Sequence, residues 1–577
     1  MHFPAALAAT AVLAAATVSA QTNDGPTDGN AFALGQIIVT GRAVHGIEIG
    51  QSTLSSAAMV AFDRTTLDDA VNLMPGVSAS NSGGARNEQL IFVRGFDRFQ
   101  VPLSIDGIRV YLPADNRLDY GRFLTSDIAE VQVAKGYASV LDGPGAMGGA
   151  INLVTRTPTR AIEAEVRGTL NLGREADYAG YNLSTLLGTR QDRWYAQASY
   201  ARNFRDHWDL AGGYTPVAGS AEDGGARDFS RTRDWRVNAR LGLTPNATDE
   251  YSLSYTRQEG SKNAPLHVTD PVARQRNWSW PYWNIESIYF LSTTALGDRA
   301  TLKTRAYHTS FDNLLRAFDD RSQTTQTLGR AFNSYYADKA WGGSVQLAVD
   351  LAPSDRFSIA AHYRRDKHAE WQQGFPGGFT EPRQTNQEDS YSIAAENHLA
   401  LAPSLAFVAG ISLDWRDLSR AEDYGTPPTG GAATIFSYPL KNSDAVNGQG
   451  RLVWSPDADS SLHASVSSRT RFPTIFERFS TQFGTAASNP DLRPERATNV
   501  EIGGMREFGL LHAEGAVFYS ALSDAIVSVR PAGFPDNSTQ RQNLGSATYY
   551  GAELALRAQL GRHAALVDGV LTELSSR

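Results

Sequence analysis

The stretch that decides the fold is LAFVAGISLDWRDLS, residues 405–419. Apolar side chains such as Phe407, Ile411 and Leu413 alternate along it with Ser412 and Asp414. A period of two places the two sets on opposite faces of a β-strand. The stretch therefore predicts a long strand with one apolar and one polar face.

The same alternation recurs over most of the chain to either side of this stretch. Further examples are RWYAQASYARNF (193–204), EYSLSYTRQ (250–258), ATLKTRAYHTS (300–310), FSIAAHYRRD (357–366) and SLHASVSSRTRF (461–472). Strands of a soluble sandwich average about five or six residues, whereas segments of about ten with aromatic ends suit tilted membrane strands. The connections also alternate, from the short 243–251 to the long polar 206–234. We predict a membrane β-barrel; an exported soluble β protein is the alternative.

Composition excludes several other classes. The 577 residues carry 53 basic and 61 acidic side chains, a net charge of −8, and no cysteine. Without a basic run, nucleic acid is not an expected partner, and without cysteine there is no thiolate chemistry or disulfide. The 11 histidines form no HExxH motif, so neither a catalytic metal nor another cofactor is expected.

The N-terminus resembles a secretory signal peptide. Residues 1–20 hold an apolar stretch and end in Val18-Ser19-Ala20, a small-x-small cleavage site. No later apolar run reaches 18 residues, so no transmembrane helix is predicted.

Residues 36–158 read differently from the alternating region. They combine the short strands IIVT (37–40) and LIFVRG (90–95), a helix at TTLDDAVNLMP (65–75), and a glycine-rich end, LDGPGAMGGAINLVTR (141–156). Thr66 is positioned to cap the helix, and Pro75-Gly76 to end it. We therefore predict a compact α/β domain before the barrel.

Four stretches in this order resemble the TonB-dependent outer-membrane receptors. They are IIVTG (37–41), the run from 65 to 110 with VRGF and IDG, IAEVQVAKGYASVLDGPGAMGGAINLVTRTP (128–158), and the barrel motifs RFPTIFERFS (471–480), NPDLRPERATNVEIG (489–503) and NLGSATYYGAELAL (543–556). The resemblance implies a signal peptide (1–20), a periplasmic segment (21–36), a TonB box (37–41), a plug (42–158) inside an antiparallel transmembrane barrel (159–567) and a non-barrel tail (568–577).

The resemblance assigns coupling to the TonB box, residues Ile37, Ile38, Val39, Thr40 and Gly41. An exposed apolar strand offers free backbone groups to which a partner can add a strand. The alternative is that IIVT is the first strand of the plug itself.

The family also implies an ion cluster between plug and barrel, matched here by Arg94, Lys135, Glu501 and Glu553. Lys135 stands where an arginine is usual, and it keeps the charge but loses the bidentate fork. The alternative is that each is an ordinary charge of the barrel lumen.

Ligand contacts are expected from plug loops that face outward. Arginine beside aromatic rings suits a planar anionic metal chelate, although the arginines could instead pair with barrel aspartates. The candidates are Arg86, Phe96, Arg98, Phe99, Tyr111, Arg117 and Tyr120. The cluster of Trp278, Trp280, Tyr282 and Trp283 fits a membrane-interface girdle better than a ligand cage.

The end of the barrel is expected to be incomplete. The alternating region has room for about 16–18 strands, whereas outer-membrane transporters with a plugged lumen have about 22. Alternation stops after Leu566 and no terminal aromatic follows, so an unclosed barrel is predicted.

The resemblance implies a non-enzymatic, monomeric receptor of the bacterial outer membrane, in contact with its lipid. TonB, acting with ExbB and ExbD, would drive uptake of a ferric siderophore. Cobalamin or another nutrient is the alternative ligand, and a truncated, non-functional receptor is the alternative state. A passive porin fits less well, because it lacks a folded plug with such a box.

Overall fold

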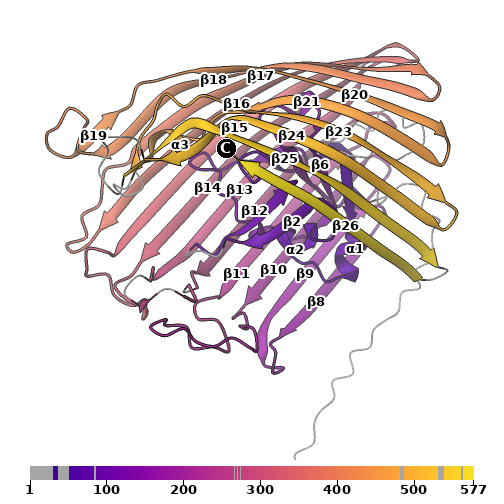
Figure 1. The fold of residues 1–577 in the computed structure, drawn as a ribbon. Coiled ribbons are helices and arrows are strands. Elements are labelled where there is room, and N and C mark those ends of the chain that lie inside the picture. Colours follow the sequence, from indigo (N-terminus) through magenta and orange to yellow (C-terminus); the bar gives the residue numbers. More distant parts are fainter. Residues whose placement is uncertain are drawn as a thin grey trace, which may run out of the picture.

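The chain forms a closed β-barrel whose lumen is filled by an N-terminal plug (Figure 1). The computed structural model describes residues 30–36, 51–82, 86–265, 267–269, 271–272, 275–480, 486–530, 538–560 and 563–576. The expected signal peptide (1–20) and TonB box (37–41) lie outside these residues.

The plug is built on a five-stranded sheet with the order β1-β6-β7-β4-β5 and a separate β2–β3 pair. Its strands are β1 (Gln51–Ser55), β2 (Val77–Asn81), β3 (Gln89–Val93), β4 (Leu103–Ile105), β5 (Ile108–Val110), β6 (Ile128–Lys135) and β7 (Gly149–Thr155). Its helical elements are η1 (Ala33–Gly35), α1 (Ser56–Ala61), α2 (Leu67–Val71), η2 (Tyr120–Arg122) and η3 (Val140–Asp142). Every residue of β6 and β7 is buried, so both faces of the central sheet are covered.

The helix predicted at 65–75 is present as the shorter α2. Thr66 occupies the N-cap position, but its hydroxyl donates to Asp69 Oδ2 over 3.3 Å instead of capping a backbone amide. None of the described helices is long and apolar enough to cross a membrane.

Close approach of two strands requires one glycine of the glycine-rich stretch 141–156. Gly149 has φ +131°, and a Cβ there would lie 2.2 Å from the carbonyl oxygen of Ala134 on β6. Only glycine fits this position without moving the strand.

The barrel wall consists of seventeen long strands in the described part of the chain, together with the short β19 (Thr434–Ser437) and β22 (Ala486–Ala487) and the loop helix α3 (Ile475–Phe479). The long strands are β8 (Glu163–Leu172), β9 (Tyr178–Arg190), β10 (Trp194–Arg205), β11 (Thr232–Leu243), β12 (Glu250–Asn263), β13 (Trp278–Ala295), β14 (Ala300–Ala317), β15 (Phe332–Ala352), β16 (Asp355–Gly374), β17 (Gln384–Ala402), β18 (Leu405–Gly425), β20 (Ser443–Asp457), β21 (Ser460–Arg471), β23 (Glu495–Phe508), β24 (Leu511–Val529), β25 (Thr539–Leu560) and β26 (His563–Ser576).

The alternation read from the sequence matches the two faces of the wall. On β18, Ile411 is 57% and Leu413 46% exposed on the outside, whereas Ser412 and Asp414 are buried toward the lumen. The connections alternate as predicted: two residues separate β17 from β18, and 26 separate β10 from β11. Short turns on one side and long loops on the other are typical of outer-membrane barrels, with the long loops outside the cell.

The expectation of an unclosed barrel with a non-barrel tail at 568–577 is wrong. β26 runs to Ser576 and pairs with β25 from Leu560↔His563 to Ala547↔Ser576, and β8 follows β26 in the closed ring. Side-chain alternation is weak here, but the ladder uses backbone groups that every residue but proline supplies. Apart from β26 and β8, all neighbouring long strands of the ring pair antiparallel. Because the described ring has seventeen long strands, an odd number, its first and last strands, β8 and β26, run in the same direction.

The tryptophans predicted to form an outer girdle point inward. Trp278, Trp280 and Trp283 are each buried, and the Trp283 ring meets Phe123 of the plug edge to face at 6.0 Å. The register of β13 against β14 shifts between Ser279 and Tyr282. A shift of this kind moves side chains between faces and places Trp278 and Trp280 on the face where Trp283 lies. The clustering of the rings, on which the girdle prediction rested, gives no sign of this shift.

Candidate functional site

An ion cluster joins the plug to the barrel beside β6. Arg94 Nε lies 2.7 Å from Glu553 Oε1, its Nη2 lies 3.2 Å from Oε2, and its Nη1 contacts Glu501. Lys135 Nζ donates to Glu553 Oε2 over 3.0 Å. The structure thus brings together all four residues that the family resemblance suggested, and all four are buried.

The pKa values of the two cations of this cluster shift in opposite directions. Burial opposes the charge on Arg94, but Glu501 and Glu553 outweigh it and raise the pKa of the guanidinium. Burial lowers the pKa of Lys135 by more than its single contact with Glu553 raises it. Arg94, which bridges both carboxylates, is therefore the principal cation of the cluster.

Three features that support the cluster were not foreseen from the sequence. His463 Nε2 contacts Glu501, and the Phe518 ring lies 4.4 Å from the Arg94 guanidinium carbon. Gly76 gives Glu553 its space, because a Cβ there would lie 2.0 Å from Glu553 Oε1. These contacts join separate strands and loops, so no local sequence signal could reveal them.

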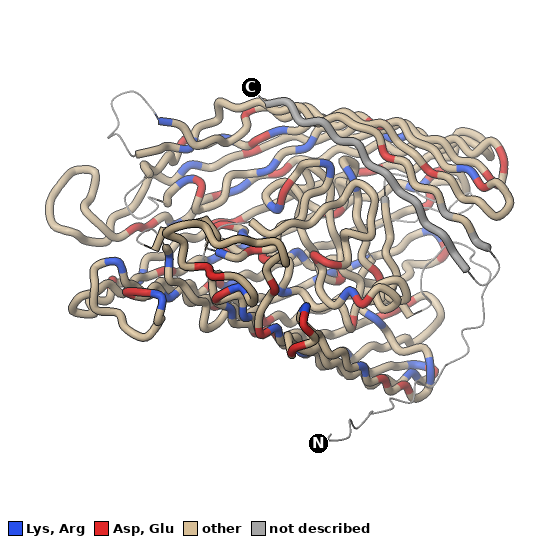
Figure 2. The backbone as a smooth tube through the Cα atoms, turned by 60° about the horizontal axis from the view of Figure 1, so that its bottom comes forward, with Lys and Arg blue, Asp and Glu red and all other residues tan. Residues whose placement is uncertain are grey.

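Further ion pairs and hydrogen bonds surround the plug, and Figure 2 shows acidic and basic positions on both the plug and the strands around it. The plug–barrel pairs among the described residues include Asp106–Arg240, Asp119–Lys262, Arg122–Asp234, Asp127–Arg236 and Arg156–Glu165. Arg469 of β21 also donates to the backbone carbonyls of Ala138 and Gly143, each over 3.0 Å. Polar contacts of this kind are replaceable by water, so they can hold a plug that must still move.

A second region, here called the arginine cavity, is a cavity of about 110 Å³ between plug and barrel. Its charged lining side chains are Arg109, Arg305, Arg364, Arg416 and Arg471 against Asp142, Asp366 and Glu388. Aromatic side chains also line it, namely Phe99, Tyr111, Tyr307, Tyr363, Tyr391 and Phe472. Arg364 pairs with Asp366, Arg416 with Glu388, and Arg471 with Glu477 and Glu495, whereas Arg109 and Arg305 form no ion pair with a described carboxylate.

The plug arginine of this cavity is not neutralised by the protein. Arg109 Nη1 donates to the carbonyl of Pro144 over 3.0 Å, but no described carboxylate lies within 4.0 Å of its guanidinium. Burial, with the nearby Arg364, lowers the pKa of Arg109 to about 10. Arg109 Nε, Tyr111 Oη and Arg364 Nη1 are buried without a hydrogen-bond partner. Buried donors without partners are costly, so this lining is complementary to an anionic ligand.

Only two of the seven predicted ligand residues line the arginine cavity, namely Phe99 and Tyr111. Phe96 and Tyr120 lie in the plug core, with exposed fractions of 1% and 0%. The remaining three are arginines held by plug or loop contacts: Arg86 lies 3.5 Å from Glu88, Arg98 donates to Glu88 over 2.9 Å, and Arg117 lies over the Phe476 ring.

Arg109 was missed because it lies inside the family motif around Asp106-Gly107, where it reads as a strand residue. The alternation of β5 offered the only signal, since Ile108 and Val110 face the core and Arg109 points away.

A plugged barrel with a charged plug–wall interface defines an outer-membrane receptor, and the comparisons agree. Residues 167–575 match the family "TonB dependent receptor-like, beta-barrel", and residues 47–150 match the "TonB-dependent Receptor Plug Domain". The chain belongs to the TonB-dependent receptors, non-enzymatic proteins of the bacterial outer membrane whose members take up substrates with the help of TonB.

Individual relatives are distant. The chain is 23% identical to the vitamin B12 transporter BtuB of Vibrio vulnificus over 82% of its own length and 67% of that protein. Against BtuB of Vibrio cholerae O395, the match spans 42% of the relative, less than half of its length.

Two solved structures share the fold at low identity. The copper transporter OprC has a TM-score of 0.73 at 16% identity, covering 91% of this chain and 80% of OprC. The ferric yersiniabactin uptake receptor FyuA of Yersinia pestis has a TM-score of 0.68 at 15% identity, covering 91% and 79%.

Proposed function

We propose that this receptor takes up an anionic metal chelate, specifically a ferric siderophore, across the outer membrane in a TonB-dependent manner. The observation that carries the proposal is the arginine cavity, in which Arg109 has no carboxylate partner and buried donors lack acceptors. Siderophore oxygens that bear negative charge would accept from these groups. Tyr111 would hold the two arginines in place, because the guanidinium carbons of Arg109 and Arg364 lie 5.0 and 4.6 Å from the centre of its ring.

Energy would enter through the TonB box, Ile37 to Gly41, by strand addition from TonB. The next described segment of the chain is β1, which forms an edge of the plug sheet and pairs with β6. Lys135 ends β6 and belongs to the ion cluster. Force on the box would therefore reach β1 and then the region of the cluster, so the plug would move after the cluster opens.

Cobalamin is the second candidate, because the distant sequence relatives include transporters named for vitamin B12. The two candidates differ in negative charge, which is the property that the cavity selects. A carboxylate or catecholate chelate of iron is more strongly anionic than cobalamin. The name of OprC adds copper as a third ligand to test.

The test is a binding and uptake panel. Purified receptor in detergent is titrated with anionic ferric chelates, a neutral ferric chelate, cyanocobalamin and Cu²⁺, and uptake of labelled iron is measured in cells with and without TonB. We expect the tightest binding for an anionic ferric chelate and TonB-dependent uptake of the same compound. Tighter binding of cyanocobalamin or Cu²⁺ would overturn the proposal.

A further inference from the structure

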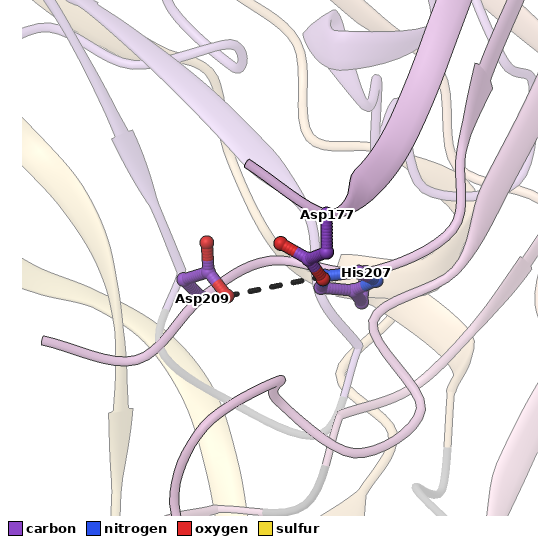
Figure 3. Close-up of side chains that lie close together, drawn as sticks. All are labelled: Asp177, His207 and Asp209. Atoms are coloured by element: carbon purple, nitrogen blue, oxygen red, sulfur yellow. Dashed lines mark ion pairs between the residues drawn. The ribbon is translucent and has the colours of Figure 1, made fainter. Parts of the chain in front are cut away.

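We propose that Asp177, His207 and Asp209 form a binding site for a divalent transition-metal ion at the long-loop end of the barrel (Figure 3). Asp177 immediately precedes β9, and His207 and Asp209 follow the end of β10. One ligand atom from each of the three residues lies within 4.8 Å of the others. None of the three lines the arginine cavity, so the site is separate from the proposed chelate site.

The histidine is oriented toward the two aspartates. His207 Nδ1 lies 3.2 Å from Asp206 Oδ2, which fixes one side of the ring. The other nitrogen, Nε2, lies 3.3 Å from Asp177 Oδ2 and 3.9 Å from Asp209 Oδ1. It is buried and makes no hydrogen bond.

This arrangement sets one imidazole nitrogen and two carboxylate oxygens around a single point, with ligand atoms within 4.8 Å of one another. A metal ion at that point would be bound by His207 Nε2 and by one oxygen each of Asp177 and Asp209. The carboxylate of Asp206 would then hold the imidazole from behind, as in carboxylate–histidine–metal arrangements.

The donor set indicates the class of metal. Imidazole nitrogen favours Zn²⁺, Cu²⁺ or Ni²⁺, whereas Ca²⁺ and Mg²⁺ prefer oxygen ligands alone. One nitrogen and two carboxylates resemble three-ligand zinc sites, which leave a further position for water. The sequence patterns did not predict this site, because Asp177 lies in a different connection from His207 and Asp209.

The surrounding loop already holds the ligands in place. The backbone of Asp209 forms an isolated antiparallel β-bridge with Ala226, and the backbone amide of Leu210 donates to the carbonyl of Gly225 over 2.8 Å. Asp209 Oδ2 also accepts from the backbone amide of Arg174 over 2.6 Å. An ion at this site would therefore link the β8–β9 connection to the 26-residue β10–β11 loop.

The test uses metal alone on the purified, chelator-treated full-length receptor in detergent. Titration calorimetry with ZnCl₂ is expected to give one site with a dissociation constant of about 10 μM or lower. His207→Ala should remove this site, and Asp206→Asn should weaken it by roughly tenfold. His267→Ala, which alters a histidine of another long loop, is the matched control and should bind as the wild type does.

Electron paramagnetic resonance with Cu²⁺ gives a second readout that does not depend on uptake. Nitrogen hyperfine coupling is expected in the wild type and in His267→Ala, and its loss is expected in His207→Ala. Unchanged stoichiometry in His207→Ala overturns the proposal. So does a wild type that binds no Zn²⁺, or one that binds Ca²⁺ more tightly than Zn²⁺.

Discussion

The ion cluster and the arginine cavity both place plug arginines against the barrel, but they treat the charge in opposite ways. In the cluster, Arg94 reaches two carboxylates and its hydrogen-bonding capacity is used by the protein. In the cavity, Arg109 reaches only a carbonyl, and its Nε has no partner. A satisfied buried cation holds structure together, whereas an unsatisfied one is available for a ligand.

The two arginines also differ in pKa. The pKa of Arg94 is raised, because two carboxylates outweigh burial. The pKa of Arg109 is lowered to about 10 by burial and by Arg364. Arg109 remains charged at neutral pH, and the nearby Asp366 only partly offsets its desolvation, so the cavity presents a cation without an ion-pair partner among the described residues.

Removal of residues 37–41 should have the largest effect on uptake. It leaves the ion cluster and the arginine cavity intact but removes the segment through which TonB is proposed to pull on the plug. We expect uptake to fall to the level of cells without TonB, while surface binding of the ligand stays unchanged. Labelled-ligand binding and uptake on the same cells would measure this. Loss of binding together with uptake would argue that the segment is part of the plug fold.

Breaking the cluster should have the next largest effect. Glu553→Gln removes the carboxylate shared by Arg94 and Lys135, so the plug should lose about 3–5 kcal/mol of stability, the usual cost of leaving a buried charge unpaired. Denaturant unfolding of the purified receptor, with hydrogen exchange in the plug, would measure it. Glu286→Gln, which alters an exposed ion pair with Arg257 on the barrel, is the control; an equal loss in both variants would contradict this role.

The cavity should also respond to pH through Asp142. Burial raises the pKa of this plug carboxyl to about 7, although Arg305, Arg469 and Lys303 favour its ionised form; Glu396 opposes that form. Below this pKa the group is neutral, and above it the added negative charge opposes an anionic ligand. Affinity for the chelate should therefore fall by about three- to tenfold between pH 6 and pH 8.

Asp142→Asn supplies the matched control, because an amide stays neutral over this range. The variant should lose most of the pH dependence and bind as the wild type does near pH 6. A variant with the full wild-type pH dependence would show that another group is responsible.

Arg86→Ala should have the smallest effect. The Arg86 side chain is 31% exposed, and its ion pair with Glu88 is long at 3.5 Å. Partly exposed pairs contribute about 0–1 kcal/mol, and Arg86 does not line the cavity. Stability and affinity should both stay close to wild type; a tenfold loss of affinity would bring this loop into the ligand site.

Sequence patterns predicted the barrel well because each wall strand separates an apolar outer face from a polar inner one. They failed where that rule is weak. β26 is held by its backbone ladder with β25, and the shifted register of β13 places Trp278 and Trp280 on the inner face that Trp283 already occupies. Neither feature leaves a periodic signal in the chain.

The site was predictable only in part. Arg94, Lys135, Glu501 and Glu553 could be placed by resemblance, since each lies in a family motif. The cavity could not, because Arg109 and Arg364 come from β5 and β16, and their closeness depends on how the plug sits in the lumen. Loop aromatics such as Phe96 and Tyr120 looked available, but packing buries them.

The most direct test of the central claim compares Arg94→Ala with Arg109→Ala in one preparation, with stability and ligand affinity measured for both. Arg94→Ala should unfold several kcal/mol more easily and keep its affinity for the chelate within about twofold. Arg109→Ala should keep its stability and lose affinity by about 10- to 100-fold, the loss expected when one charge-assisted hydrogen bond to the ligand is removed. If the two variants change stability and affinity alike, the division into a structural cluster and a ligand cavity is wrong.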